Sequence, residues 1–154
     1  MSEPVNTLTV NDLHVLKNEG YFGPVTPVSF YLPGTSAATN GNYDVVFFIA
    51  DRDYELIQAV ERHGTAGTDA SSVQILVTKL PDGVAIGSGT NITPNPSFNL
   101  KATANTLQKV YPVSGASGGI PYATIPRNYG LAMARSGDVT SVANVCVTLY
   151  LKAI

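Results

Sequence analysis

The side chains that could do acid–base or nucleophilic chemistry are few in this chain of 154 residues, which has two histidines and one cysteine. His14 or His63 could act as a general base for one of the many serines. Ser117, in the run Ala116-Ser117-Gly118-Gly119, is not followed by a helix-forming segment, which a nucleophile elbow requires. We therefore expect no catalytic residue and no enzymatic activity.

A metal site would need three or four ligands gathered in one place. His63 and Asp69 lie close in sequence, across the run Gly64–Thr68, and could contribute to a metal or polar site. Asp and Thr side chains in such a run more commonly bond to their own loop backbone. The sequence therefore favours a self-bonded loop, with no metal and no cofactor.

Cys146 is the only cysteine, so neither an intramolecular disulfide nor a cysteine-ligated zinc site is expected, and a small structural role is favoured. The glycine-rich segment 83–90 has no lysine and opens no helix, so it does not match a phosphate-binding loop. Nine Lys and Arg residues are scattered singly and the net charge is −2, which argues against nucleic acid as a partner. Apolar runs such as 45–50 are far shorter than the roughly 20 residues that span a bilayer, so no membrane partner is expected.

The elements that would position these residues are predicted to be strands. Only 13% of the residues are charged, and short β-prone runs alternate with turns rich in Gly, Pro, Asn, Ser and Thr. This pattern predicts an all-β, antiparallel β-sandwich of jelly-roll-like type with at most one short helix. The predicted strands are residues 26–32, 43–50, 73–80, 98–101, 106–111, 129–135 and 143–152.

The segment 53–63 has spacing that suits a helix and alternation that suits a strand, so the local pattern leaves both interpretations open. A helix, if one exists, is expected there or in residues 10–18. In contrast, residues 143–152 alternate cleanly, with apolar side chains on one face and Cys146 on the more polar face.

The run 45–50 is apolar on both faces, although a sandwich core can cover only one of them. Strict alternation would place Val45, Phe47 and Ile49 on one face, with Val46 and Phe48 on the other. We expect Val46 and Phe48 to form an interface between subunits. The rival interpretation is that the N-terminal arm or a long loop covers them within one chain.

The segment 111–128 is rich in Gly and Pro and is predicted to be a long surface loop without regular structure. Tyr111, Tyr122 and Tyr129 are candidate interaction-loop residues. Such tyrosines could stack on a sugar or simply pack in a core or interface. Residues 1–24 have few strand signals and form a candidate docking arm, and residues 25–154 form the sandwich domain. No secretory signal is visible at the start, so folding in a reducing cytoplasm is expected.

A pattern over about residues 43–153 resembles structural proteins of tailed bacteriophages, of the capsid decoration, head-fibre or tail-associated kind. The resemblance rests on a His-x-x-Ala-Gly-Thr-Asp turn at 63–69, the apolar strand 73–80 and a Leu-Lys-x-Thr-Ala-Asn stretch at 100–105. A late Gly137-Asp138 turn before a final apolar strand is also similar. The loop 111–127 departs from that pattern, and residues 1–25 match nothing in it.

The resemblance implies a non-enzymatic virion protein, made in the host cytoplasm and assembled onto a particle. Its implied role is capsid decoration through protein–protein contacts, as a homo-oligomer, with a trimer favoured. The implied partners are other copies of the chain and the major capsid protein or another virion protein. The alternative is a receptor- or sugar-binding module of a phage fibre.

Overall fold

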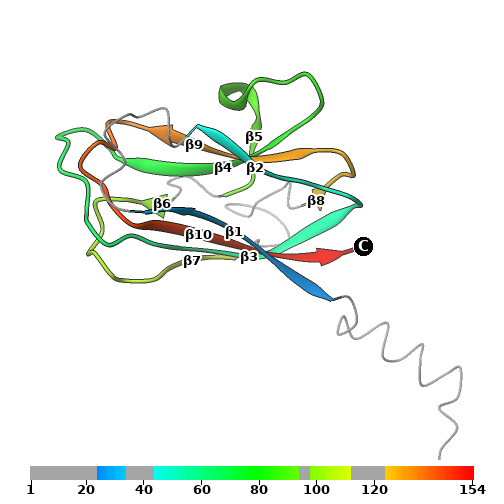
Figure 1. Ribbon diagram of the computed structural model, residues 1–154, viewed down its shortest axis with the longest axis horizontal. Coiled ribbons are helices and arrows are strands. Elements are labelled where there is room, and N and C mark those ends of the chain that lie inside the picture. The colour runs from blue at the N-terminus through cyan, green and yellow to red at the C-terminus, as the bar shows by residue number, and fades with distance from the viewer. Residues whose placement is uncertain (1–23, 34–43, 94–97, 112–123) are drawn as a thin grey trace, which may run out of the picture.

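Two antiparallel sheets form the molecule in a computed structural model that describes residues 24–33, 44–93, 98–111 and 124–154 (Figure 1). The first sheet has the order β1 (Val25–Leu32), β10 (Val145–Ala153), β3 (Tyr54–Arg62) and β7 (Gln108–Val110), and β8 (Thr124–Ile125) also pairs with β3. The second sheet has the order β2 (Val45–Ile49), β9 (Gly130–Ser136), β4 (Gln74–Leu80) and β5 (Thr90–Asn91), and β6 (Phe98–Asn99) also pairs with β4. The predicted all-β antiparallel sandwich is confirmed.

The chain path through the two sheets is that of a jelly roll. The long strands alternate between the sheets along the sequence, so that β1 and β3 lie in the first sheet while β2 and β4 lie in the second. The last two long strands return to the middle: β9 inserts between β2 and β4, and β10 between β1 and β3. This double Greek-key order is characteristic of jelly rolls.

The core lies between the facing sheets and is built from alternating side chains. In β10, Val145, Val147, Leu149 and Leu151 are all fully buried, as the alternation of this segment predicts. Opposite them, β4 and β9 contribute other fully buried side chains: Ile75, Val77, Leu131 and Met133. Burying each such side chain stabilises the fold by about 1.5–3 kcal/mol, which is why one face of each strand is so uniformly apolar.

The ambiguous segment 53–63 forms a strand, β3. It pairs along most of its length with β10, from Tyr54 opposite Ala153 to Arg62 opposite Cys146. Tyr54, Leu56 and Ala59 are buried against the core. Tertiary pairing, rather than local spacing, therefore decides this element.

The one helical segment among the described residues is the single 3₁₀ turn η3 (Ile86–Ser88), which no sequence pattern indicated. The prediction that the loop 111–128 has no regular structure is wrong at Thr124–Ile125, which pair with Glu55 and Tyr54 as β8. This pairing is possible because Ile125 is fully buried and anchors the segment to the core. Within the described ranges, no helix is long and apolar enough to cross a membrane.

Candidate interaction surface

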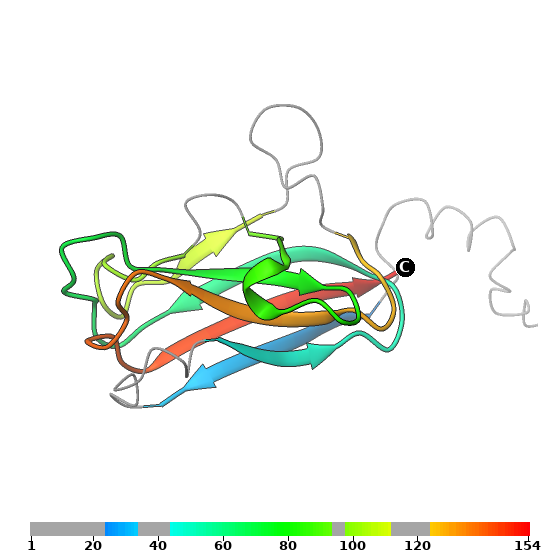
Figure 2. The ribbon, with the colours of Figure 1, turned by 90° about the horizontal axis from the view of Figure 1, so that it is seen from above.

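The edge strands β1 and β2 lie along the same side of the sandwich, where Figure 2 shows them as the blue and cyan ribbons. Within the described part of the chain, β1 pairs only with β10 and β2 only with β9. The rings of Phe30 and Phe47 meet between the two strands with centroids 6.0 Å apart. We call this side, made of β1 and β2, the open side.

The open side carries apolar side chains and no charge. Neither β1 (VTPVSFYL) nor β2 (VVFFI) contains a charged residue. Tyr31 is 59% exposed, Val46 is 42% exposed and Ile49 is 67% exposed. Natural edge strands are commonly protected by charged side chains, by proline or by β-bulges, and β1 and β2 lack the first of these three.

Two features of the open side disfavour edge-to-edge pairing with a β-strand of another chain. Pro27 lies within β1, and proline cannot donate to a ladder of backbone hydrogen bonds. The pairing of β2 with β9 shifts between Val46 and Phe48, which marks an irregularity of the β-bulge type. A partner on this side would therefore contact side chains more readily than backbone.

The same irregularity corrects the assignment of faces in β2. Val46 lies opposite Ala132, but Phe48 lies opposite Leu131, so Phe47 has no opposite residue. Phe47 and Phe48 both pack against the core, and the ring of Phe48 meets that of Tyr54 at 5.9 Å. Val46 and Ile49 are the residues left exposed.

Strict alternation therefore fails in β2, and the expectation that Val46 and Phe48 share an outward face is wrong. Of the two interface candidates, Val46 is available on the open side, whereas Phe48 belongs mainly to the core. Ile49 was not identified from the sequence because alternation placed it on the core side. The extra residue in β2 that turns Ile49 outward becomes visible only once β2 is aligned with β9.

The three candidate tyrosines do not gather into one site among the described residues. Tyr111 is 56% exposed, directly after β7 in the first sheet. Tyr129 precedes β9 in the second sheet and is partly buried against the core, and its backbone carbonyl accepts a hydrogen bond from the Ala50 amide at 2.9 Å. Tyr122 lies outside the described residues. Tyr129 thus has the packing role that the sequence left open, and Tyr111 stays a candidate contact.

The two candidate metal ligands have separate hydrogen-bond partners. His63 is fully buried, with Nδ1 3.0 Å from Glu61 Oε1 and Nε2 3.1 Å from the Ala102 carbonyl oxygen. Hydrogen bonding to the Glu61 carboxylate raises the His63 pKa, and burial opposes that rise. In the described ranges, no group of three His, Cys, Asp or Glu side chains is arranged to hold a metal ion.

Asp69 organises the loop between β3 and β4. Its carboxylate accepts hydrogen bonds from the Ser71 amide and hydroxyl at 3.2 and 2.6 Å, and from the Asp138 amide at 3.1 Å. These bonds, with the Ser71 hydroxyl first, lower the pKa of Asp69. The arrangement has the geometry of the self-bonded loop that the sequence favoured.

The pKa of Asp51 is lowered to about 2, although this carboxyl occupies an exposed turn. The cause is its hydrogen bonding to the Arg52 guanidinium, followed by the hydrogen bond from the Tyr54 hydroxyl at 2.5 Å. Both partners are close in sequence: Arg52 lies in the β2–β3 turn, and Tyr54 is the first residue of β3. The shift reflects local turn chemistry and gives no sign of a catalytic acid.

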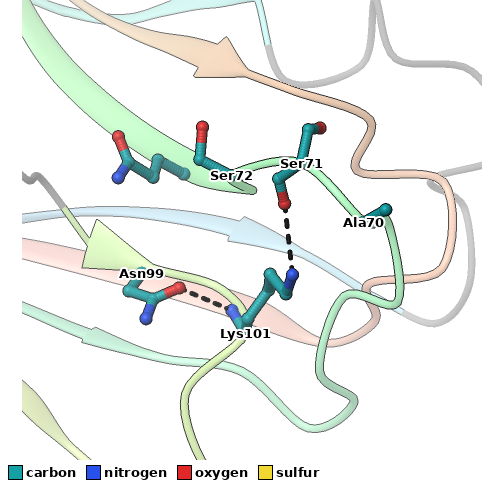
Figure 3. A pocket seen from close by; sticks show the side chains of 6 residues that line it. Ala70, Ser71, Ser72, Asn99 and Lys101 are labelled. Carbon is teal, nitrogen blue, oxygen red and sulfur yellow. Dashed lines mark hydrogen bonds between the residues drawn. The ribbon is translucent and has the colours of Figure 1, made fainter.

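A shallow polar hollow lies at the loop end of the sandwich, beside the β3–β4 loop (Figure 3). Its lining residues are Ala70, Ser71, Ser72, Gln74, Asn99 and Lys101. The Lys101 ammonium donates to the Ser71 carbonyl at 3.2 Å, and the Lys101 amide donates to Asn99 Oδ1 at 3.0 Å. The hollow presents amides, hydroxyls and one cation, which are the groups that bind a polar ligand.

The remaining polar feature of interest is the outer face of the first sheet. Cys146 is half-buried there, opposite Tyr31 on one side and Arg62 on the other. Ser29 and Thr148 share a hydrogen bond of 2.8 Å between their hydroxyls, one pair further along. This face is continuous with the open side through Tyr31.

Comparison with known proteins gives matches in structure but none in sequence. No family model matches the sequence, and no curated protein matches it. A chain in the solved capsid of Ralstonia phage GP4 superposes with a TM-score of 0.52 at 10% identity, covering 86% of each chain. A chain in the capsid asymmetric unit of cyanophage Pam1 gives a TM-score of 0.45 at 12% identity, covering 100% of this chain and 93% of that one. The first of these shows that this chain shares the fold of a chain found in a phage capsid structure.

Proposed function

We propose that this chain is a non-enzymatic structural protein of a bacteriophage virion, and specifically a capsid decoration protein that acts through protein–protein contacts. The observation that carries the proposal is the jelly-roll fold, shared over 86% of its length with a chain of the GP4 phage capsid structure. The resemblance in the sequence to phage virion proteins supports the same role.

The open side supplies the contact surface that this role needs. A decoration protein must bury part of its surface against other chains, and β1 and β2 offer exposed apolar side chains without charge. Leaving Val46 and Ile49 in water forgoes about 1.5–3 kcal/mol for each side chain that a partner could bury completely. We propose that copies of the chain associate through this side into a homo-oligomer, with a trimer favoured by the resemblance.

The partner on the particle is proposed to be the major capsid protein or another virion protein. Residues 1–24 are proposed as the docking arm, because they precede β1 on the open side and fall before the sandwich domain. In this arrangement the sandwich associates with its own copies and the arm attaches the assembly to the particle.

Imaging purified virions with an antibody or fusion label on this chain tests the proposal. Label in a regular array over the capsid surface is the expected result. Virions that contain no copy of the chain by mass spectrometry would contradict a structural role. Label confined to the tail or its fibres would support the alternative below.

A receptor- or sugar-binding module of a phage fibre is the second candidate, and the polar hollow at the loop end favours it. Amide and hydroxyl groups like those of Gln74, Asn99 and Ser72 commonly hydrogen-bond to sugars. A glycan array decides between the two, because a decoration protein should bind no sugar. Binding that Asn99→Ala removes would support the fibre module.

A further inference from the structure

A buried cluster at the loop end joins β3 to the segment that connects β6 with β7. Glu61 lies on β3 and His63 follows the end of that strand two residues later, and both side chains are fully buried. Gln108 of β7 donates from Nε2 to Glu61 Oε2 at 2.6 Å, while Glu61 Oε1 lies 3.0 Å from His63 Nδ1. His63 Nε2 lies 3.1 Å from the Ala102 carbonyl oxygen.

The partners of this cluster fix how many protons it holds. A carbonyl oxygen can only accept, so His63 Nε2 must carry a hydrogen. The contact between Nδ1 and Glu61 Oε1 also needs one hydrogen, because otherwise two lone pairs would face each other. These contacts require two protons in the Glu61–His63 pair, and since an imidazole is a stronger base than a carboxylate, both lie on His63 as an imidazolium.

The surrounding elements leave Glu61 as the charged group that faces His63. Gln108 is neutral, and the segment 100–105 contributes a backbone carbonyl. The charged side chains nearest in sequence on these elements are Arg62, Lys101 and Lys109, and all three are exposed. Asp69, on the following loop, bonds instead to Ser71 and to the Asp138 amide.

The cluster holds the segment 100–105, which is in turn bonded to the β3–β4 loop. The Asn105 amide donates to the His63 carbonyl at 2.7 Å, and the Gly67 amide donates to the Leu100 carbonyl at 2.8 Å. The segment 100–105 is thus bonded both to the end of β3 and to the β3–β4 loop. Loss of the Ala102–His63 bond would free the middle of this segment.

We propose that Glu61, His63 and Gln108 form a proton-dependent lock, which holds the 100–105 segment on β3 while His63 is protonated and releases it when that proton leaves to solvent. When His63 becomes neutral, its remaining proton stays on Nδ1, because the charged Glu61 carboxylate is the stronger acceptor. The Nε2 lone pair then faces the Ala102 carbonyl oxygen, and the bond that holds the segment is lost. Two buried acceptor atoms that face each other without a hydrogen are costly, so the 100–105 segment moves away and the local structure opens to water.

The direction of the switch follows from the raised pKa of His63, which the Glu61 carboxylate causes. The lock is closed at and below the ordinary histidine value of 6.5. It opens as the pH rises through the higher value in the folded protein. The loop end of the sandwich, including the polar hollow, is therefore rigid at pH 6.5 and below and loosens as the pH rises through the His63 pKa.

Nuclear magnetic resonance of the His14→Gln variant tests the proposal, because it leaves His63 as the only histidine. The imidazole nitrogens report protonation, and amide exchange of Gly67 and Asn105 reports the loop. Both ring nitrogens should carry hydrogen at pH 6.5 and below. The protection factors of the two amides, corrected for the intrinsic pH dependence of exchange, should fall by roughly tenfold or more as His63 titrates above 6.5. Constant protection through the titration, or a midpoint below 6.5, would overturn the proposal.

A second variant, Glu61→Gln, distinguishes the lock from loss of amide protection caused by other groups that titrate at high pH. It keeps the shape of the side chain but removes the charge that retains the proton. We expect His63 in this variant to titrate at lower pH, with the loss of protection moving by the same amount. Loss of protection at an unchanged pH would show that another group controls the loop. The His63 titration in the His14→Gln variant remains decisive if the Glu61→Gln variant fails to fold.

Discussion

Gly137 lies directly against the Ser72 backbone carbonyl, at the point where the turn after β9 crosses the start of β4. Its φ angle is 83°, a left-handed value that glycine adopts without cost. A Cβ atom at this position would overlap the Ser72 carbonyl oxygen, and neither backbone can move without disturbing the pairing of Gln74 with Ser136. The turn between β9 and β10 therefore depends on this glycine for two independent reasons.

The first prediction concerns this glycine and a matched partner. Gly137→Ala should lower the free energy of unfolding by about 3 kcal/mol or more, combining backbone strain with a steric overlap. Gly83→Ala is the control, because Gly83 has a similar φ of 77° but open space around its Cβ position. It should cost only about 1 kcal/mol. Urea denaturation of both variants measures the difference, and equal losses would contradict the overlap.

The second prediction concerns stability in acid. The pKa of Asp69 is lowered by hydrogen bonds from Ser71 and from the Asp138 amide. A depressed carboxyl pKa contributes stability that is present above the ordinary value of 3.8 and is lost as the pH falls through the folded-state value. Asp69→Asn should therefore lower stability at pH 7 and flatten its dependence on pH below 4.

Asp82→Asn is the control for this acid effect, because Asp82 is exposed in the turn after β4. It should leave both the stability and its acid dependence close to those of the wild type. Denaturation midpoints measured from pH 2 to pH 7 provide the comparison. An Asp69→Asn variant with an unchanged acid profile would show that the loop bonds do not depend on the charge.

The third prediction is a double-mutant cycle on the buried pair. His63→Leu leaves the Glu61 carboxylate buried with Gln108 as its remaining side-chain partner, so it should destabilise the fold by about 3–5 kcal/mol. Changing Glu61 to Leu as well removes the stranded charge and should recover much of that loss. Denaturation of the two single variants and the double variant at pH 7 gives the coupling. Additive losses would mean that the two side chains do not act as a pair.

The pH dependence of the same pair has the opposite sign to that of Asp69. A raised histidine pKa contributes stability that is fully present below 6.5 and is lost as the pH rises through the folded-state value. The wild type should therefore lose stability on the alkaline side, and the double leucine variant should not show this loss.

Alternation in the sequence predicts the strands that bury one face. It does not decide the features that depend on pairing with a distant strand, such as the segment 53–63 and the bulge in β2. In residues 145–151 alternation correctly separated Val145 and Leu149 from Cys146, because this central strand packs on one side only. The segment 53–63 stayed ambiguous, since the pairing with β10 that decides it lies about ninety residues away in the chain. The bulge at Phe47 was missed for the same reason, because an extra residue exists only relative to the partner strand.

The same limit applies to the buried polar cluster: relations along one strand follow from the sequence, whereas relations between strands do not. The sequence indicates His63 as a polar site residue and points to Asp69, in the following loop, as its partner, whereas the structure gives it Glu61. The relation between Glu61 and His63 follows directly once 54–62 is known to be a strand, because residues two apart share a face. Gln108 could not have been found, since only the pairing of β3 with β7 brings it opposite Glu61.

The last prediction tests the open side by comparing two neighbouring residues of β2. Ile49→Asp places a charge on an exposed position, so the subunit should keep its fold while the homo-oligomer dissociates. Phe48→Asp places the charge against Tyr54 and the core, so it should destabilise the subunit itself by more than about 3 kcal/mol.

Sedimentation at tens of micromolar measures the mass, and circular dichroism measures the fold. The wild type should sediment as a trimer of the 16.2 kDa chain, Ile49→Asp as a folded monomer, and Phe48→Asp as largely unfolded or aggregated material. A wild type that is monomeric at this concentration would refute self-association, and an Ile49→Asp trimer would place the interface elsewhere on the molecule.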